Sequence, residues 1–213
     1  MTVAHDSPPS LLVLHAVRSL GFTDPAAIAR RTGVGHDTAV EILRDAEQRG
    51  WVRHDAFAGL EGWSLTEEGR AENQRRLAEE RTGADPDDVI GSLYRDFLPL
   101  NAHLVSACTD WQVRPVGDDR LAPNDHADPA WDARVLEELA ALSAALAPLV
   151  ARLADVLTRF AGYDTRFDTA LRRARAGQNE WVDRTDVDSC HRVWFQLHED
   201  LIATLGIDRR TEH

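Results

Sequence analysis

The chain has 213 residues, 43% of them hydrophobic, with a mean hydropathy of -0.37, so it can form one large domain or two small ones. No apolar run approaches the roughly 18 residues of a transmembrane helix, and no basic and apolar leader opens the sequence. The two cysteines, Cys108 and Cys190, form neither a disulfide framework nor a CxxC motif. We therefore expect a cytoplasmic protein with no membrane partner.

The formal net charge is -12, and all 24 basic residues are arginines. Residues 1–82 hold 10 Arg against 13 acidic residues, a net charge of -3, and the remainder holds 14 against 23, a net charge of -9. Nucleic-acid binders usually present a basic surface, because neutralised phosphates supply most of their affinity. Since neither part of the chain is basic overall, DNA binding has to depend on local geometry.

The first fifty residues predict three helices. Leucines and valines at helical spacing indicate a helix over residues 10–20 that ends at Gly21. The pair Asp24-Pro25 begins a second helix that stops at Gly33. After a turn at Val34-Gly35, a third helix covers residues 36–49. Two short helices joined by a glycine-containing turn are the pattern of a helix-turn-helix unit.

Two strand-like segments follow, at residues 51–54 and 62–65, and Thr66 caps a polar helix that runs to about residue 81. Residues 28–52, IARRTGVGHDTAVEILRDAEQRGWV, and residues 64–70, SLTEEGR, resemble the helix-turn-helix and the segment after the hairpin in MarR-type bacterial regulators. The resemblance covers about residues 10–80. It implies a winged helix-turn-helix domain at residues 1–82 whose third helix enters the major groove of double-stranded DNA.

The resemblance places a set of basic and polar residues toward DNA, and we predict that these contact it: Arg30, Arg31, His36, Thr38, Arg44, Arg53 and His54. Three acidic residues oppose this prediction, because Asp37, Glu41 and Asp45 stand at i, i+4 and i+8 on one helical stripe. The hairpin offers only two of the predicted residues, both near its base. An alternative is a retained scaffold that serves dimerisation or binds a protein partner.

Residues 83–213 predict an all-helical bundle domain. A helix after Asp85-Pro86 with a kink at Pro99 is followed by a long loop at residues 111–127, and further helices cover about residues 129–160, 164–176 and 187–205. The longest of these carries apolar residues at alternating spacings of four and three: Val135, Leu139, Leu142, Leu146, Leu149, Leu153, Val156 and Phe160. This heptad seam predicts either packing within the bundle or a homodimer interface.

Two groups of residues in this region are candidates for binding a small-molecule effector. His191, Trp194 and His198 share a stripe of the last helix, and such a polar-aromatic stripe beside an apolar face suggests a pocket. In the long loop, Arg114 offers a guanidinium fork, with Trp111 and His126 beside it in sequence. The alternatives are buried, hydrogen-bonded histidines and loop residues that cap helix ends, with Asp128 as the cap of the long helix.

A metal site would need residues such as His103, His126, His191 and His198 to converge. The last two are separated by about 10.5 Å along one helix, whereas a metal ion needs ligands about 2 Å away. We therefore predict neither a metal nor another cofactor. The sequence contains no GxSxG, P-loop or GxGxxG motif, so no catalytic residue is assigned and we do not expect an enzyme.

Together these patterns predict a mainly α-helical chain. Residues 1–82 form a winged helix-turn-helix with a small β-hairpin, and residues 83–213 form a helical domain for dimerisation and effector binding. The predicted function is that of a homodimeric, DNA-binding transcriptional regulator that senses a small molecule. The alternative is a non-DNA-binding adaptor or biosynthetic accessory protein that keeps the winged helix as a scaffold.

Overall fold

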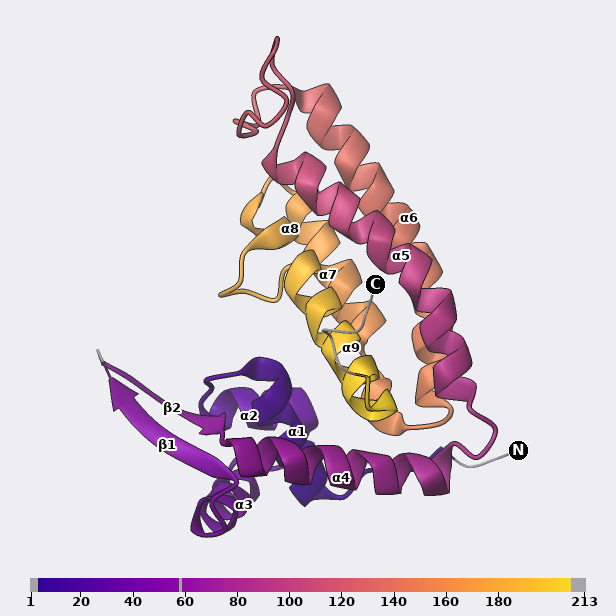
Figure 1. Ribbon diagram of the computed structural model, residues 1–213. Coiled ribbons are helices and arrows are strands. Elements are labelled where there is room, and N and C mark those ends of the chain that lie inside the picture. The colour runs from indigo at the N-terminus through magenta and orange to yellow at the C-terminus, as the bar shows by residue number, and fades with distance from the viewer. Residues whose placement is uncertain (1–3, 58, 208–213) are drawn as a thin grey trace. The chain divides into compact units, whose positions relative to one another are not determined.

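The computed structural model describes residues 4–57 and 59–207, which are mainly helical and include a small two-stranded antiparallel sheet (Figure 1). The chain divides into two compact units. The first contains Met1–Asp88, Asp155–Arg159 and Glu199–His213, and the second contains Val89–Ala154 and Phe160–His198. The sequence predicted a single division between residues 82 and 83. In the structure, two later segments of the chain belong to the N-terminal unit.

The first unit begins with three helices, α1 (Pro9–Leu20), α2 (Pro25–Thr32) and α3 (His36–Gln48). The predicted start of α2 is confirmed, because the Asp24 carboxylate accepts a hydrogen bond of 2.8 Å from the amide of Ala27. The predicted end of α2 is also confirmed: Gly33 adopts a left-handed conformation, with φ of 72°, which suits a residue without a Cβ. Local capping chemistry therefore sets the limits of α2.

The hairpin consists of β1 (Val52–Phe57) and β2 (Leu60–Leu65), with Val52 opposite Leu65. Both strands run further toward the turn than the sequence predicted, because the backbone ladder continues to the last pair. The main chain of β2 also pairs with the segment before α2, where the amide of Trp63 donates to the carbonyl of Thr23 at 2.7 Å. Thr66 then caps α4 (Glu67–Ala84) by accepting a hydrogen bond from the amide of Gly69.

The core of the first unit is formed by the inner faces of α1, α2 and α3 with two residues of the hairpin. Its buried members are Val13, Leu14, Ala16, Val17, Ile28, Ala39, Leu43, Ala46, Val52 and Trp63. A smaller buried cluster joins Leu11 of α1, Leu77 of α4 and Ala203. The last of these lies in the final turns of α9 (Cys190–Leu205), whose residues from Glu199 onward belong to this unit.

The second unit is built from α5 (Val89–Gln112), α6 (Pro129–Ala154), α7 (Tyr163–Arg175), the short α8 (Glu180–Asp183) and the first half of α9. The long helices α5 and α6 lie side by side, and α7 packs on α6 (Figure 1). None of the helices formed by the described residues is long and apolar enough to cross a membrane.

The heptad seam packs inside the chain. Its residues on α6 are between 0% and 6% exposed, and Phe160 is fully buried. The helix ends at Ala154, earlier than the sequence predicted. Beyond that point, the carbonyl of Val156 accepts from the amide of His5 at 2.9 Å, and the amide of Thr158 donates to the carbonyl of His5 at 3.1 Å. These bonds to a distant segment replace the hydrogen bonds that would continue the helix. The burial of the seam favours core packing over a homodimer interface.

Two glycines of α4 give a matched test of the packing between this helix and the start of the hairpin. A Cβ on Gly69 would lie 1.7 Å from the carbonyl oxygen of Trp51, whereas a Cβ on Gly83 would meet nothing within 4 Å. We expect Gly69→Ala to lower the free energy of unfolding by about 1–3 kcal/mol, as overpacking does. Gly83→Ala should instead raise it by about 0.5–1 kcal/mol, because alanine favours the helix. Urea unfolding of both variants checks this, and equal stabilities would contradict the close approach.

Candidate functional site

A cluster of buried charged side chains lies in the first unit. Arg159, Glu80 and Asp200 have side chains only 2% to 3% exposed. The Arg159 guanidinium donates to Glu80 at 3.1 Å, to Asp200, and to the Thr204 hydroxyl at 2.8 Å. The Nε2 atom of His15 lies 3.0 Å from Oδ1 of Asp200. The cluster therefore ties α1, α4, the segment 155–159 and the end of α9 together.

The pKa of Asp200 reflects two opposing effects. Burial by itself raises the pKa of this carboxyl, but the positive charge of Arg159 and the contact with His15 outweigh burial. Arg31 of α2 contributes in the same direction. The net result is a pKa well below the usual aspartate range, so Asp200 stays ionised in the interior. A buried charge of this kind is tolerated only when its partners remain in place.

A cavity of about 310 Å³ adjoins this cluster. Its walls come from the N-terminal segment at residues 6–7, from α1, from the end of α2, from residues 158–159 and from α9. Most of the residues that line it have polar side chains, among them Ser7, His15, Ser19, Arg31, Thr32 and Asp200, although apolar atoms account for more of the exposed wall than polar atoms do. The apolar part consists of Leu12 and Ala16. All of these residues belong to the first unit.

No sequence motif marks this site. Its charged residues lie far apart in the chain, and their pairing follows from tertiary contacts alone. One local signal was present in α9. Asp200 lies seven residues after Val193 and three residues after Leu197, both fully buried, so the three residues share one face of the helix. An acidic residue on the apolar stripe of a helix indicates a buried, paired charge. That signal identifies Asp200 but not its partners.

The predicted DNA-contact residues fall into two groups. Six of them are exposed on consecutive elements of the first unit: Arg30 on α2, His36, Thr38 and Arg44 on α3, and Arg53 and His54 on β1. Arg31 is half-buried and lines the cavity. The structure therefore brings six of the seven residues to the surface and places the seventh in the interior site.

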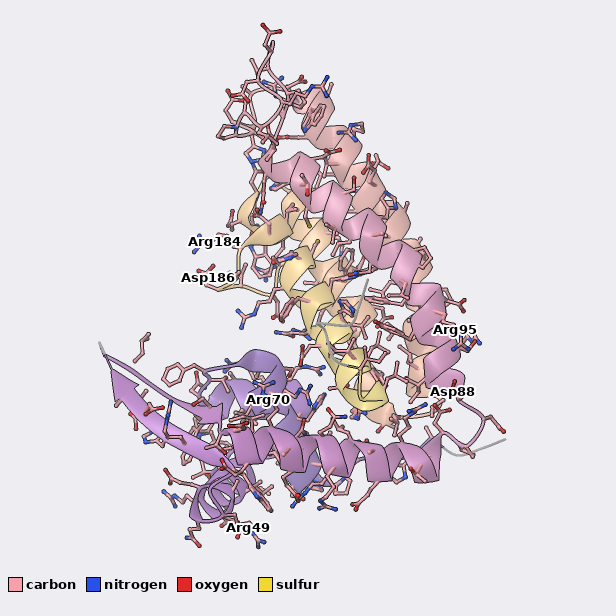
Figure 2. All side chains as sticks on the ribbon, in the orientation of Figure 1. Arg49, Arg70, Asp88, Arg95, Arg184 and Asp186 are labelled. Atoms are coloured by element: carbon pink, nitrogen blue, oxygen red, sulfur yellow. The ribbon has the colours of Figure 1, made fainter. Side chains whose placement is uncertain are left out.

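Acidic side chains accompany these exposed cations. The Arg53 guanidinium lies 2.6 Å from Asp55, and His54 lies 3.1 Å from Glu61. Arg49 at the end of α3 pairs with Asp45 at 2.9 Å (Figure 2). Exposed pairs of this kind contribute little to stability, but each carboxylate offsets a cation that would otherwise attract phosphate. The surface around α3 therefore carries mixed charge.

The predicted effector residues of the long loop hold the loop against the start of α6. Trp111, which the sequence placed in the loop, lies instead in the last turn of α5 and is 2% exposed. Its ring lies 4.5 Å from that of His126, whose Nδ1 is 3.0 Å from the Asp132 carboxylate. Arg114 donates to Asp128 at 3.3 Å. Asp128 also accepts hydrogen bonds from the amides of Ala130 and Trp131, which confirms it as the cap of α6. These contacts favour a structural role for the loop residues.

The predicted effector residues of α9 lie in the second unit. Trp194 is 1% exposed, stacks on Phe97 at 5.0 Å and donates its Nε1 proton to Asn101 at 3.0 Å. His198 is half-buried and lies 5.4 Å from the same Phe97 ring. His191, at the start of the helix, is also half-buried. Trp194 is thus a core residue with its polar atom satisfied.

The thiols have the character of core residues. Burial raises the pKa of Cys108 to about 12 and also raises that of Cys190. Both thiols therefore stay protonated near neutral pH, and a protonated thiol is a poor nucleophile. Within residues 4–57 and 59–207, no group of three or more histidine, cysteine, aspartate or glutamate side chains is arranged to hold a metal ion.

The buried cluster predicts a strong dependence of stability on Asp200. Asp200→Asn removes one of the two buried carboxylates that pair with Arg159 and leaves only Glu80, so we expect the free energy of unfolding to fall by about 3–5 kcal/mol. The control is Asp186→Asn, because Asp186 pairs with Arg184 at the exposed surface (Figure 2) and should change stability little. Thermal or urea unfolding measures both, and equal losses would contradict the role of burial.

Asp200 also determines part of the dependence of folding stability on acidic pH. Because the pKa of Asp200 is lower in the folded protein than in the unfolded chain, its stabilisation is complete above about pH 5 and begins to decline at about 3.9, the unfolded value. It is fully lost only once the pH has fallen through the lower pKa of the folded state. Stability should therefore decline more steeply below pH 5 in the wild type than in Asp200→Asn. Unfolding curves between pH 7 and pH 3 check this, and parallel profiles would contradict it.

No family model, no curated protein and no solved structure matches this chain. The resemblance of residues 10–80 to MarR-type regulators stays a prediction from the sequence.

Proposed function

We propose that the protein is a DNA-binding transcriptional regulator whose first unit contains a winged helix-turn-helix. In this proposal α2 and α3 form the helix-turn-helix and β1–β2 form the wing. The inner face of α3 is buried through Ala39, Leu43 and Ala46. Its outer face is therefore free to enter a major groove, as the second helix of such motifs does.

The observation that supports the proposal best is the shared exposure of six predicted contact residues on α2, α3 and β1. Thr38 and Arg44 lie on the outer face of α3, where they can reach base edges, and arginine is the usual reader of guanine. Arg30 and Arg53 flank them and suit phosphate contacts. Because Asp37, Glu41 and Asp45 lie on the same helix and repel phosphate, we expect modest non-specific affinity for DNA. Direct base recognition should then supply a larger share of the binding energy.

The proposed regulator acts as a homodimer on two half-sites about 34 Å apart. A small-molecule effector would change the separation of the two copies of α3 by binding one arrangement better than the other. The heptad seam on α6 is buried within the chain, so the dimer contact would use other surfaces. No cofactor is part of the proposal.

DNA binding predicts a salt dependence that one arginine should alter. At low salt, the full-length protein should bind a duplex of its own promoter. The affinity should fall as the salt concentration rises, because binding releases cations from the DNA and this release is less favourable at high salt. Arg30→Ala should reduce the slope of log affinity against log salt by about 1, the contribution of a single phosphate contact. Fluorescence anisotropy at several salt concentrations measures both quantities.

Arg172→Ala is the matched control for that experiment. Arg172 is exposed on α7 in the second unit and pairs with Asp168 at 2.9 Å, so its removal changes the net charge equally without touching the proposed DNA surface. An unchanged slope in Arg30→Ala, or equal changes in both variants, would contradict the proposed surface. Absence of binding at low salt would overturn the DNA-binding proposal.

The acidity of α3 favours a second candidate function, that of an adaptor whose winged helix binds a basic protein segment. Asp37, Glu41 and Asp45 are all exposed on α3. Carboxylates on one face attract arginine-rich or lysine-rich surfaces and repel phosphate. The two candidates therefore predict opposite effects when the carboxylates are neutralised.

The double variant Asp37→Asn/Glu41→Gln distinguishes the two candidates. A DNA-binding surface should gain affinity for the promoter duplex at low salt, because two repulsive charges are removed. An adaptor surface should lose affinity for a deca-arginine peptide and should bind DNA no better. Anisotropy titrations with both probes measure this. Higher affinity for the duplex with unchanged affinity for the peptide would exclude the adaptor. Lower affinity for the peptide with unchanged affinity for the duplex would exclude the regulator.

A further inference from the structure

The size of the cavity in the first unit limits what it can hold. Its volume of about 310 Å³ is at the lower end of the range for ligand pockets, which runs from about 300 to 1,000 Å³. Since a water molecule takes about 30 Å³ in the liquid, a ligand with roughly ten heavy atoms fits. Larger molecules such as peptides and nucleotides would extend beyond the cavity.

The charges on the cavity wall are balanced by each other. Arg159 and Asp200 form an ion pair, and His15 contacts the same carboxylate. The second carboxylate of the wall, Asp6, accepts a hydrogen bond of 2.7 Å from the Thr158 hydroxyl. An anionic ligand would face both carboxylates, and a cationic ligand would face the guanidinium groups of Arg31 and Arg159. The wall therefore favours a ligand without net charge.

Hydroxyl groups make up much of the remaining polar wall. Ser19 donates to the carbonyl of Ala16 at 3.3 Å, and Thr32 donates to the carbonyl of Ile28 at 2.8 Å. Each hydroxyl oxygen has two acceptor lone pairs, so Ser19 can accept a further bond after donating its proton. Thr32 already accepts a hydrogen bond of 3.2 Å from the amide of Val34, which leaves it one lone pair. A ligand that presents several donors and acceptors matches this wall.

Ser7 gives an independent indication. It lines the cavity and is 7% exposed, and its buried Oγ has no hydrogen-bond partner among the described residues. A buried polar atom without a partner costs stability, about 1–3 kcal/mol. Such atoms in native structures call for an explanation, and a ligand that hydrogen-bonds at the cavity wall supplies one.

From these observations we infer that the cavity binds a small, uncharged, polyhydroxylated molecule of about monosaccharide size. Its hydroxyl groups would donate to and accept from the serine and threonine side chains, Asp6 and Arg31. Its C–H groups would lie on the apolar part of the wall formed by Leu12 and Ala16. This inference deepens the effector sensing in the proposed function and moves the effector site from the second unit to the first.

The position of the cavity connects it to the proposed DNA-binding helices. Arg31 and Thr32 are the last two residues of α2, directly before the left-handed turn at Gly33 that leads to α3. A ligand held by these residues has a different affinity for each orientation of α2. That difference is what an effector needs in order to shift the protein between two states.

Isothermal titration calorimetry of the full chain without DNA tests the inference. The probes are D-glucose, D-ribose and myo-inositol, with methylammonium and inorganic phosphate as the cationic and anionic comparators. We expect saturable binding of at least one hydroxylated probe and no comparable binding of the charged ones. Ser19→Leu should fill the cavity and reduce affinity more than 10-fold. Ser10→Leu is the matched control, because Ser10 is exposed in the first turn of the same helix.

Ser7→Ala provides a second test that does not depend on a large side chain being tolerated. The unliganded variant should melt at the same temperature as the wild type or higher, because an unsatisfied hydroxyl has been removed. Its Kd for the hydroxylated probe should rise about 2- to 10-fold, as expected for one neutral hydrogen bond. Ser10→Ala should change neither quantity.

Three results would overturn the inference. The first is no saturable binding of any hydroxylated probe up to roughly 10 mM, a binding energy below about 3 kcal/mol. The second is tighter binding of methylammonium or phosphate, and the third is binding that Ser19→Leu and Ser7→Ala leave unchanged. DNA is absent from every titration. A failure here therefore leaves the DNA-binding proposal intact, and a failure of DNA binding leaves the cavity assignment intact.

Discussion

The ion pair between Arg159 and Asp200 is the interaction on which the first unit depends. Both side chains are almost fully buried, and a buried charge is stable only beside its counter-charge. Arg159 also binds Glu80 of α4, and Asp200 also contacts His15 of α1. Removing Arg159 would leave two buried carboxylates without their counter-charge, and removing Asp200 would leave Arg159 with Glu80 alone. The N-terminal unit is therefore completed by residues from the second half of the chain, and residues 1–88 alone would lack two of the charges that the cluster requires.

This dependence affects the proposed function. The hairpin and α3 present residues suited to DNA, but the charge around them is mixed, since acidic neighbours accompany Arg53, His54 and Arg49. The interior of the same unit holds the more distinctive chemistry, a cavity lined by hydroxyls beside a neutralised ion cluster. In the proposed regulator, Arg31 is the residue that belongs to both parts, because it lies on α2 and lines the cavity.

The residues first proposed for effector binding show how local patterns can suggest a pocket where the protein has a core. The spacing of His191, Trp194 and His198 gives a polar-aromatic stripe on α9, yet Trp194 is buried between Phe97 and Phe167 with its indole proton bonded to Asn101. In the loop, Arg114 and His126 are bonded to carboxylates at the start of α6. In both places, several of the polar atoms that looked available for a ligand are bonded within the protein, among them Trp194 Nε1 and His126 Nδ1.

The sequence by itself determined the features that depend on neighbours a few residues apart: the mainly helical character, the hairpin, the caps at Asp24, Thr66 and Asp128, and the turn at Gly33. Tertiary structure alone decided that the heptad seam packs within the chain, that α6 ends where Val156 and Thr158 bond to His5, and that Arg31 faces the interior. It also assembled the site at His15, Glu80, Arg159 and Asp200. The reason is physical: caps and periodicity act within one or two helical turns, whereas the partners of a buried charge are chosen by contacts between segments far apart in the sequence, up to 185 positions in the case of His15 and Asp200.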